Sequence, residues 1–163
     1  MPRGIFRLKQ VYEEQLSGEW STKENVWLSP SPFGKTLPFG YFGGGNGPVS
    51  TVDRIDYTND TATASTKGPL SSARNYLAAT GSGAHGYFGG GWGPTKSTVD
   101  RVDYTNDTLT AAVKGSLSVA KHYLSAIGNN DFGYFAGGSP GPKSTVDRID
   151  YSNDTATASA NDH

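Results

Sequence analysis

Paired aspartates recur along the sequence, each pair separated by three positions, and such pairs can carry out acid–base chemistry. The pairs are Asp53 and Asp56, Asp100 and Asp103, and Asp147 and Asp150. Two carboxyl groups about 5 Å or about 6.5–9.5 Å apart can hydrolyse a glycosidic bond. A catalytic site is usually singular, whereas these pairs repeat identically. The pattern therefore favours structural ion pairs with Arg54, Arg101 and Arg148, and it predicts a protein that is not an enzyme.

Metal and cofactor sites are also disfavoured by the residue types. Asp56, Asn59 and Asp60 offer oxygen ligands, but no Asp-x-Asp-x-Asp-Gly calcium loop is present. The chain has no Cys, and its three His residues do not recur at matching positions. The Gly-Gly-Gly runs lack the Lys-Ser/Thr of a phosphate-binding loop. The sequence thus predicts no metal ligand and no cofactor.

Three Asn-Asp-Thr triplets match the glycosylation sequon, at Asn59, Asn106 and Asn153. Each also stands where a tight turn would join two strands, and Asn and Asp favour turns and tolerate positive φ. We therefore interpret the triplets as hairpin turns and expect Asn106 to have a positive φ.

The composition predicts an all-β protein. The 163 residues include 22 Gly, 12% aromatic residues and 18% charged residues, together with many Val, Ile and Thr. The net charge of −1 lacks the basic excess of a nucleic-acid-binding protein. No apolar run approaches the ~20 residues that span a bilayer, so membrane insertion is not expected.

An internal repeat organises the chain. Tyr41-Phe-Gly-Gly-Gly returns at Tyr87 and, with one Ala, at Tyr134, and each copy is followed by Ser-Thr-Val-Asp-Arg-(Ile/Val)-Asp-Tyr. In the middle copy this predicts four strands, over residues 85–90, 98–104, 108–113 and 122–127. Val99 and Val102 cannot share one face of a regular strand. Either a bulge realigns them, or both faces of the strand are buried between neighbouring repeats, which we prefer.

The repeat resembles the Kelch repeat in its order of strand, Gly-Gly, strand ending in Tyr, turn, strand and Gly68-Pro-Leu-Ser-Ser-Ala-Arg74. The motifs Gly-Tyr-Phe-Gly-Gly-Gly and Asn-Asp-Thr in this repeat are similar to repeats in structural proteins of marine and cyanobacterial tailed phages. The resemblance implies about three four-stranded propeller blades, as a partial propeller or an open β-repeat array. It also implies a virion protein of the tail, fibre, baseplate or capsid surface.

The segment before the repeats has a different character. We expect residues 1–35 to form a docking or capping segment with a Pro-rich connector, and residues 36–163 to form the repeat region. Leu8, Val11, Tyr12 and Leu16 have the spacing of an amphipathic helix. With Phe6 and Trp20 they could dock on another chain, or they could cover the edge of the first repeat.

Loops that differ between the copies are candidates for binding. The residues singled out are Asn46, His85 and Trp92. A three-repeat array leaves two ends open, which predicts a homo-oligomer or contacts with other virion proteins. The alternative is a module that binds a host glycan or a host surface protein, with Trp92 stacking on the ligand.

Overall fold

The computed structural model describes residues 38–141 and 144–161, and these residues form an all-β structure. The prediction of fold class is confirmed at this level, because the described chain folds into three antiparallel sheets without an α-helix. The proposed docking residues Phe6, Leu8, Val11, Tyr12, Leu16 and Trp20 lie outside the described residues.

Each sheet is built on the two central strands of one copy of the repeat, and sheets 2 and 3 begin with a strand from the end of the copy before. Sheet 1 contains β1 (Phe39–Gly43), β2 (Val52–Asp56) and β3 (Ser65–Lys67). Sheet 2 contains β4 (Ala78–Gly81), β5 (His85–Gly89), β6 (Val99–Asp103) and β7 (Ala112–Lys114). Sheet 3 contains β8 (Ser125–Gly128), β9 (Phe132–Ala136), β10 (Val146–Asp150) and β11 (Ser159–Asn161), with a short 3-10 turn at Tyr151–Asn153.

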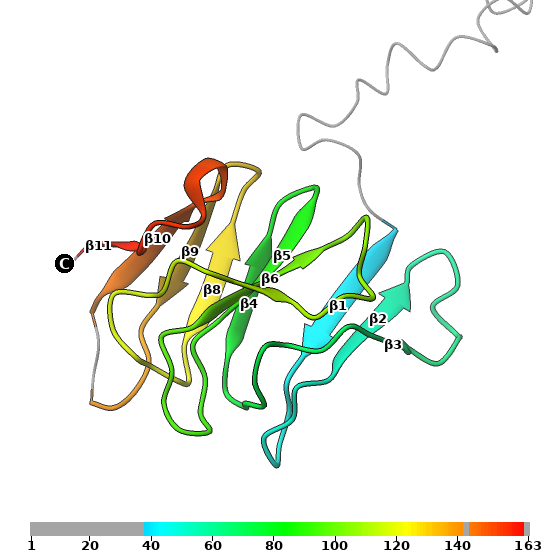
Figure 1. Ribbon diagram of the computed structural model, residues 1–163, viewed down its shortest axis with the longest axis horizontal. Helices are drawn as coiled ribbons and strands as arrows, with labels where there is room; N and C mark the ends of the chain where they lie inside the picture. Colours follow the sequence, from blue (N-terminus) through cyan, green and yellow to red (C-terminus); the bar gives the residue numbers. More distant parts are fainter. Residues whose placement is uncertain (1–37, 142–143, 162–163) are drawn as a thin grey trace, which may run out of the picture. The chain divides into compact units, whose positions relative to one another are not determined.

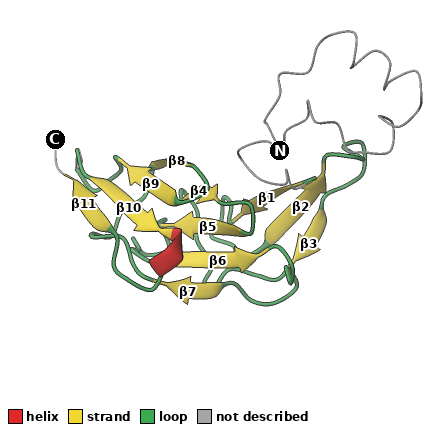
Figure 2. Cartoon of the chain, turned by 90° about the horizontal axis from the view of Figure 1, so that it is seen from above, coloured by secondary structure: helices red, strands yellow, loops and turns green. Residues whose placement is uncertain are grey.

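The three sheets stand side by side in the order of the sequence (Figure 1). Strands β4 and β8 contact each other along the inner edge of sheets 2 and 3. The outer strands β3, β7 and β11 spread apart on the other side (Figure 2). Sheet 2 therefore presents one face to sheet 1 and the other face to sheet 3.

Strand β6 shows how the middle sheet is buried on both faces. Its pairing with β5 runs without interruption from His85 opposite Asp103 to Gly89 opposite Val99, so the strand contains no bulge. Val99 packs in a core with residues of sheet 3, and Val102 packs in a separate core with residues of sheet 1. The preferred interpretation of the two valines, burial on both faces, is confirmed.

Two hydrophobic cores hold the sheets together, and we call the contacts around them the first joint (sheets 1 and 2) and the second joint (sheets 2 and 3). The core of the first joint contains Val52, Leu70, Phe88, Val102 and Ala111. The core of the second joint contains Tyr87, Val99, Leu117, Leu124, Phe135, Ile149 and Ala158. Residues at matching repeat positions occupy equivalent places in the two cores. The same set of contacts therefore joins sheet 1 to sheet 2 and sheet 2 to sheet 3.

A phenylalanine of each following sheet packs on a glycine of the sheet before it. A Cβ atom added to Gly43 would lie 2.8 Å from the Phe88 ring, and one added to Gly89 would lie 2.7 Å from the Phe135 ring. Carbon atoms in ordinary contact are about 3.5–4.0 Å apart, so a side chain at either glycine would force the sheets apart. In sheet 3 the matching position is Ala136.

The strand positions were predicted well, but two strands begin later than expected. After the turn, residues 107–111 bond to the loop of the preceding sheet instead of pairing with β6. Gly68 N donates to Asp107 O and Ala111 N donates to Pro69 O, both at 2.8 Å. The fourth predicted strand also starts late, because His122 N bonds to Ser139 O at 3.0 Å in an isolated bridge.

The prediction of a positive φ at Asn106 was wrong. Among the described non-glycine residues only Tyr76 and Tyr123 have one. The turn is held instead by Asp103, whose carboxylate accepts bonds from Thr105 N (2.9 Å) and Thr105 Oγ1 (2.7 Å). Because the carboxylate closes the turn, Asn106 needs no left-handed backbone.

Candidate functional site

Each joint contains a buried ion pair between a loop cation and a strand aspartate. In the first joint Arg74 Nη2 lies 2.8 Å from Asp100 Oδ2, and both side chains are fully buried. The guanidinium also donates to Phe88 O at 3.1 Å and to Thr98 O at 3.5 Å. Burial lowers the pKa of Arg74, and the charge of Asp100 opposes this shift. The loop that enters sheet 2 is thereby fixed to β6.

A lysine, Lys121, forms the equivalent buried ion pair in the second joint. Lys121 Nζ lies 2.8 Å from Asp147 Oδ2, again with both side chains fully buried. It also donates to Phe135 O at 3.2 Å and to Thr145 O at 3.5 Å, the counterparts of the two carbonyls that Arg74 contacts. The three oxygens therefore form a socket that accepts either cation, and we call it the cation socket.

The aspartate of each hairpin turn reaches back to the preceding sheet. Asp107 Oδ2 accepts bonds from Tyr41 Oη at 3.0 Å and Arg54 Nη1 at 2.8 Å. Burial, and then the bond to Asp107, raises the pKa of Tyr41. Arg54 was correctly predicted to pair with an aspartate across sheets, but the partner is the turn residue and not a residue of the strand pairs.

The same contact recurs in the second joint. Asp154 Oδ2 accepts bonds from Tyr87 Oη at 3.0 Å and Arg101 Nη1 at 2.7 Å. Its other oxygen lies 3.2 Å from Lys114 Nζ. The predicted ion pair of Arg148 is not found within the described residues, because no described turn aspartate lies beyond sheet 3; its guanidinium lies over the Phe132 ring instead.

Four aromatic rings form a row that we call the aromatic row: Trp92, His122, Tyr123 and Tyr76, of which His122 is buried. Successive ring centroids are 5.0, 4.8 and 4.2 Å apart. Tyr123 is 60% exposed, and Trp92 and Tyr76 are also exposed. Hydrogen bonds between the backbones of Asn75 and Trp92, and from Tyr123 N to Tyr76 O, fix the row to sheets 2 and 3.

The two tyrosines of this row have a strained backbone. Their φ values are 52° at Tyr76 and 55° at Tyr123, a region that side chains with a Cβ atom rarely occupy. Such strain costs of the order of 1–3 kcal/mol and concentrates at functional sites. Both residues occupy the same repeat position, so the fold holds two tyrosine rings outward at a matching place in adjacent sheets.

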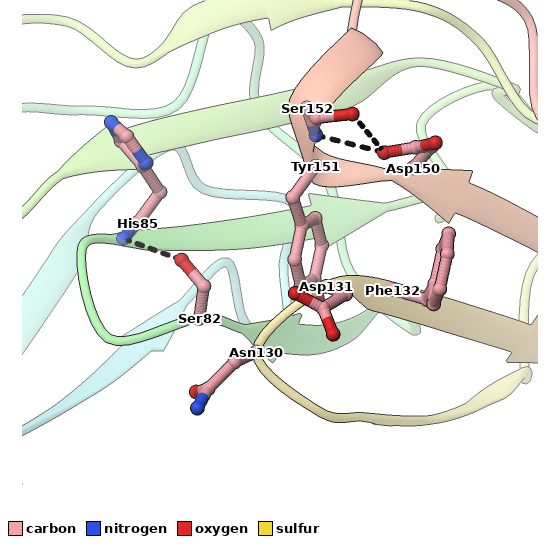
Figure 3. A pocket seen from close by; sticks show the side chains of 8 residues that line it. All are labelled: Ser82, His85, Asn130, Asp131, Phe132, Asp150, Tyr151 and Ser152. Carbon is pink, nitrogen blue, oxygen red and sulfur yellow. Dashed lines mark hydrogen bonds between the residues drawn. The ribbon is translucent and has the colours of Figure 1, made fainter. Parts of the chain in front are cut away.

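A shallow groove of about 490 Å³ lies between the turn ends of sheets 2 and 3 (Figure 3). Its lining residues come from the β4–β5 turn, the β8–β9 turn and the end of β10: Ser82, His85, Asn130, Asp131, Phe132, Asp150, Tyr151 and Ser152. Burial, together with the charge of Arg101, lowers the pKa of His85. His85 and the carboxylates of Asp131 and Asp150 line the same groove, so the groove is the natural place to look for acid–base chemistry.

One of the groove carboxylates, Asp150, is engaged in closing its own turn. Asp150 Oδ1 accepts bonds from Ser152 N at 2.9 Å and Ser152 Oγ at 2.6 Å, as Figure 3 shows. These bonds lower the pKa of Asp150, which makes it a poor proton acceptor. Asp56 and Asp103 cap their own turns in the same way. In each pair of aspartates the second carboxylate thus closes a turn, whereas Asp100 and Asp147, first in their pairs, bind the buried cations.

The three loop residues singled out from the sequence lie apart. Trp92 belongs to the aromatic row, whereas His85 lies in the groove at the opposite end of β5. Asn46 is exposed in the β1–β2 turn, where its side chain accepts a bond from Gly47 N at 3.1 Å. The structure therefore divides them among three surfaces.

Tyr76, Tyr123 and the cations Arg74 and Lys121 were not assigned a role from the sequence. A signal was present, because the tyrosines occupy one repeat position and the basic residues occupy another, in both copies of the Leu-Ser-x-Ala-(Arg/Lys)-x-Tyr-Leu segment. A bulky residue repeated in a loop gives no indication of its φ value, and this is why the aromatic row was missed.

Comparisons with known proteins give no family assignment: no family model matches the chain, and no curated protein matches it. Within residues 38–141 and 144–161 no helix is long and apolar enough to cross a membrane. The same residues contain no group of three or more His, Asp or Glu side chains that could hold a metal ion.

Proposed function

We propose that this chain is a structural component of a virion, in a tail, fibre, baseplate or capsid-surface position, and that it acts through protein–protein assembly. Its sheets would be Kelch-like blades of a partial propeller. The repeat's resemblance to structural proteins of tailed phages supports the virion assignment. The arrangement of the joints supports assembly, because each inner sheet face is specialised for contact with another sheet.

The outer face of sheet 1 is the observation that carries the proposal. Phe42 is 64% exposed, whereas Phe88 at the matching position is 2% exposed in the first joint. Tyr57 is likewise exposed, whereas its counterpart Tyr104 stacks on Tyr41 with centroids 4.7 Å apart. Burial raises the pKa of Tyr104 to about 12. Large aromatic residues dominate interface energetics, so this face is suited to a partner.

Incorporation into particles tests the proposal. A tagged chain is expressed during infection by the virus that encodes it, and particles are purified by density gradient. We expect the tagged chain to sediment with the particles and Phe42→Asp to remain in the soluble fraction. Val113→Asp is the matched control, because Val113 is exposed on the outer strand β7. A wild-type chain missing from the particles, or Phe42→Asp incorporated like wild type, would overturn the proposal.

The aromatic row supports a second candidate function, binding of a glycan by stacking of sugar rings on exposed aromatic faces. Binding to a glycan array tests it. Tyr123→Asn should lose binding, because Asn tolerates the left-handed backbone but lacks the ring. Tyr123→Phe keeps the ring and should retain binding. If no glycan binds, or Tyr123→Asn binds like wild type, this candidate fails.

A further inference from the structure

The outer faces of sheets 1 and 3 carry complementary parts of the contact that joins the sheets to one another. The turn-aspartate contact has a donor half and an acceptor half. In the second joint the donor half is Tyr87 and Arg101 of sheet 2, and the acceptor is Asp154 of sheet 3. Residues at the matching repeat positions of the other sheets therefore show which donors and acceptors lack a partner.

Among the residues that the structure describes, sheet 1 carries an unused acceptor. Asp60 occupies the position of Asp107 and Asp154, and it is exposed where both counterparts are buried. Within the described part of the chain Asp60 makes no hydrogen bond or ion pair. Tyr57 and Phe42, which would accompany it in a joint, are exposed on the same sheet.

Within the described residues, the donor half on sheet 3 is unused. Tyr134 occupies the position of Tyr41 and Tyr87, and Arg148 occupies the position of Arg54 and Arg101. No carboxylate among the described residues pairs with Arg148, and its buried Nε atom has no hydrogen-bond partner. In both joints the equivalent arginine donates to the turn aspartate through Nη1, so a carboxylate that reaches the Arg148 guanidinium would complete this face.

We infer that sheet 1 of one copy docks on sheet 3 of a second copy, with Asp60 accepting hydrogen bonds from Tyr134 and Arg148 and with Tyr57 stacking on Tyr134. The inference rests on the proposed assembly function and names its partner. The charges are complementary, since an exposed carboxylate meets an unpaired guanidinium. The contact is head-to-tail, so each copy offers one face of each kind.

Two differences make this contact weaker than the internal joints. Ala136 replaces the glycine on which the next phenylalanine packs, so its methyl group would press on Phe42 of the second copy. Asp53 occupies the position of the socket aspartates Asp100 and Asp147, yet within the described residues its bond is with Thr66 Oγ1 at 2.9 Å and not with a loop cation. The association should therefore be reversible and depend on concentration.

Sedimentation velocity of the full chain over a concentration series tests the inference. We expect the wild-type mass to increase with concentration. Asp60→Arg and Arg148→Asp should each weaken association by about thirtyfold or more. An equimolar mixture of the two variants should associate again, because one chain keeps Arg148 and the other keeps Asp60. Asp131→Arg makes the same charge change at another exposed position and should associate like wild type.

Ala136→Gly supplies a test of opposite sign, because removing the methyl should tighten association by about tenfold. Circular dichroism establishes that each variant is folded. A wild-type chain that stays monomeric, an Asp60→Arg chain that associates normally, or a mixture that fails to associate would overturn the inference. A monomeric chain that still enters particles would leave the assembly function standing with a different partner, so the two failures can be told apart.

Discussion

The two joints neutralise a buried aspartate with different cations, Arg74 in the first and Lys121 in the second. The difference shows what the cation socket requires. Arg74 and Lys121 each contact two backbone carbonyls and one buried aspartate. Lys121 donates hydrogen bonds to both carbonyls, whereas among the described residues Asp147 Oδ2 accepts no hydrogen bond and is held by the charge of the ammonium group alone. The guanidinium has five donors, and its Nε is buried without a partner. The socket therefore selects a positive charge at a fixed point rather than the fork of arginine.

The largest expected effect on stability comes from removing the cation from one socket. Lys121→Met leaves the Asp147 carboxylate buried without a counterion, and we expect a loss of about 3–5 kcal/mol in the free energy of unfolding. Urea denaturation measures it. The double variant Lys121→Met with Asp147→Leu should recover much of the loss, because no charge is then buried. A single variant as stable as wild type would show that the ion pair does not hold the second joint.

A methyl group at the centre of a joint should have the next largest effect. Gly89→Ala gives sheet 2 the residue that sheet 3 has at Ala136, and its Cβ would lie 2.7 Å from the Phe135 ring. Overpacking of this kind costs about 1–3 kcal/mol. Thermal unfolding of the variant measures the effect.

Ala136→Gly is the control for this methyl group, because Ala136 faces no further described sheet. In dilute monomer it should change stability by less than about 1 kcal/mol. Equal effects of the two substitutions would contradict the asymmetry between the inner and outer faces.

The turn-aspartate contact predicts acid sensitivity. Burial raises the pKa of Asp154, but hydrogen bonds from Tyr87, Lys114 and Arg101 outweigh it, and the pKa is lowered in the folded protein. The contact therefore stabilises the fold above about pH 4, the unfolded value, and this contribution disappears as the pH falls through the folded pKa. Urea denaturation between pH 6 and pH 2.5 should show it. Asp154→Asn should flatten this part of the profile, and an unchanged slope would argue against the contact.

The smallest effect should come from exchanging the cations. Arg74→Lys places in the first joint the residue that the second joint already uses, so we expect a change within about 1 kcal/mol. Lys121→Arg should be less well tolerated, because a larger group with unmatched donors enters a buried site. Denaturation of both variants compares the two sockets. If Arg74→Lys were as damaging as Lys121→Met, the sockets would not be equivalent.

The sequence was sufficient for features that follow from repetition and alternation. The all-β class and the strand positions followed from the repeated motif, and the burial of Val99 and Val102 on opposite faces followed from their spacing. What failed depended on conformation at single residues. Asn106 was expected to have a positive φ because Asn tolerates it, but the Asp103 carboxylate closes the turn without it.

The site was less predictable than the fold because its residues act across sheets. Arg54 was assigned an aspartate partner, but sequence spacing could not distinguish the strand aspartates from Asp107, which lies 53 residues away. Trp92 was identified as a candidate, whereas Tyr76 and Tyr123 project outward only because their backbone is left-handed. The assignment of the sheets as Kelch-like propeller blades and the docking role of residues 1–35 stay predictions.

The cation socket affects how the number of repeats in such a gene can change during evolution. Arg74 lies in the loop that enters sheet 2 and Asp100 lies 26 positions later in β6 of that sheet, and Lys121 and Asp147 are related in the same way in sheet 3. A repeat unit counted from the entering loop therefore contains both partners. A recombination event that copies a whole unit therefore duplicates both the charge and its counterion, and no compensating mutation is needed in the neighbouring units. The tolerance of the socket for Lys or Arg lets the copies diverge afterwards. Selection can thus lengthen or shorten the array one unit at a time while each new core stays electrically neutral.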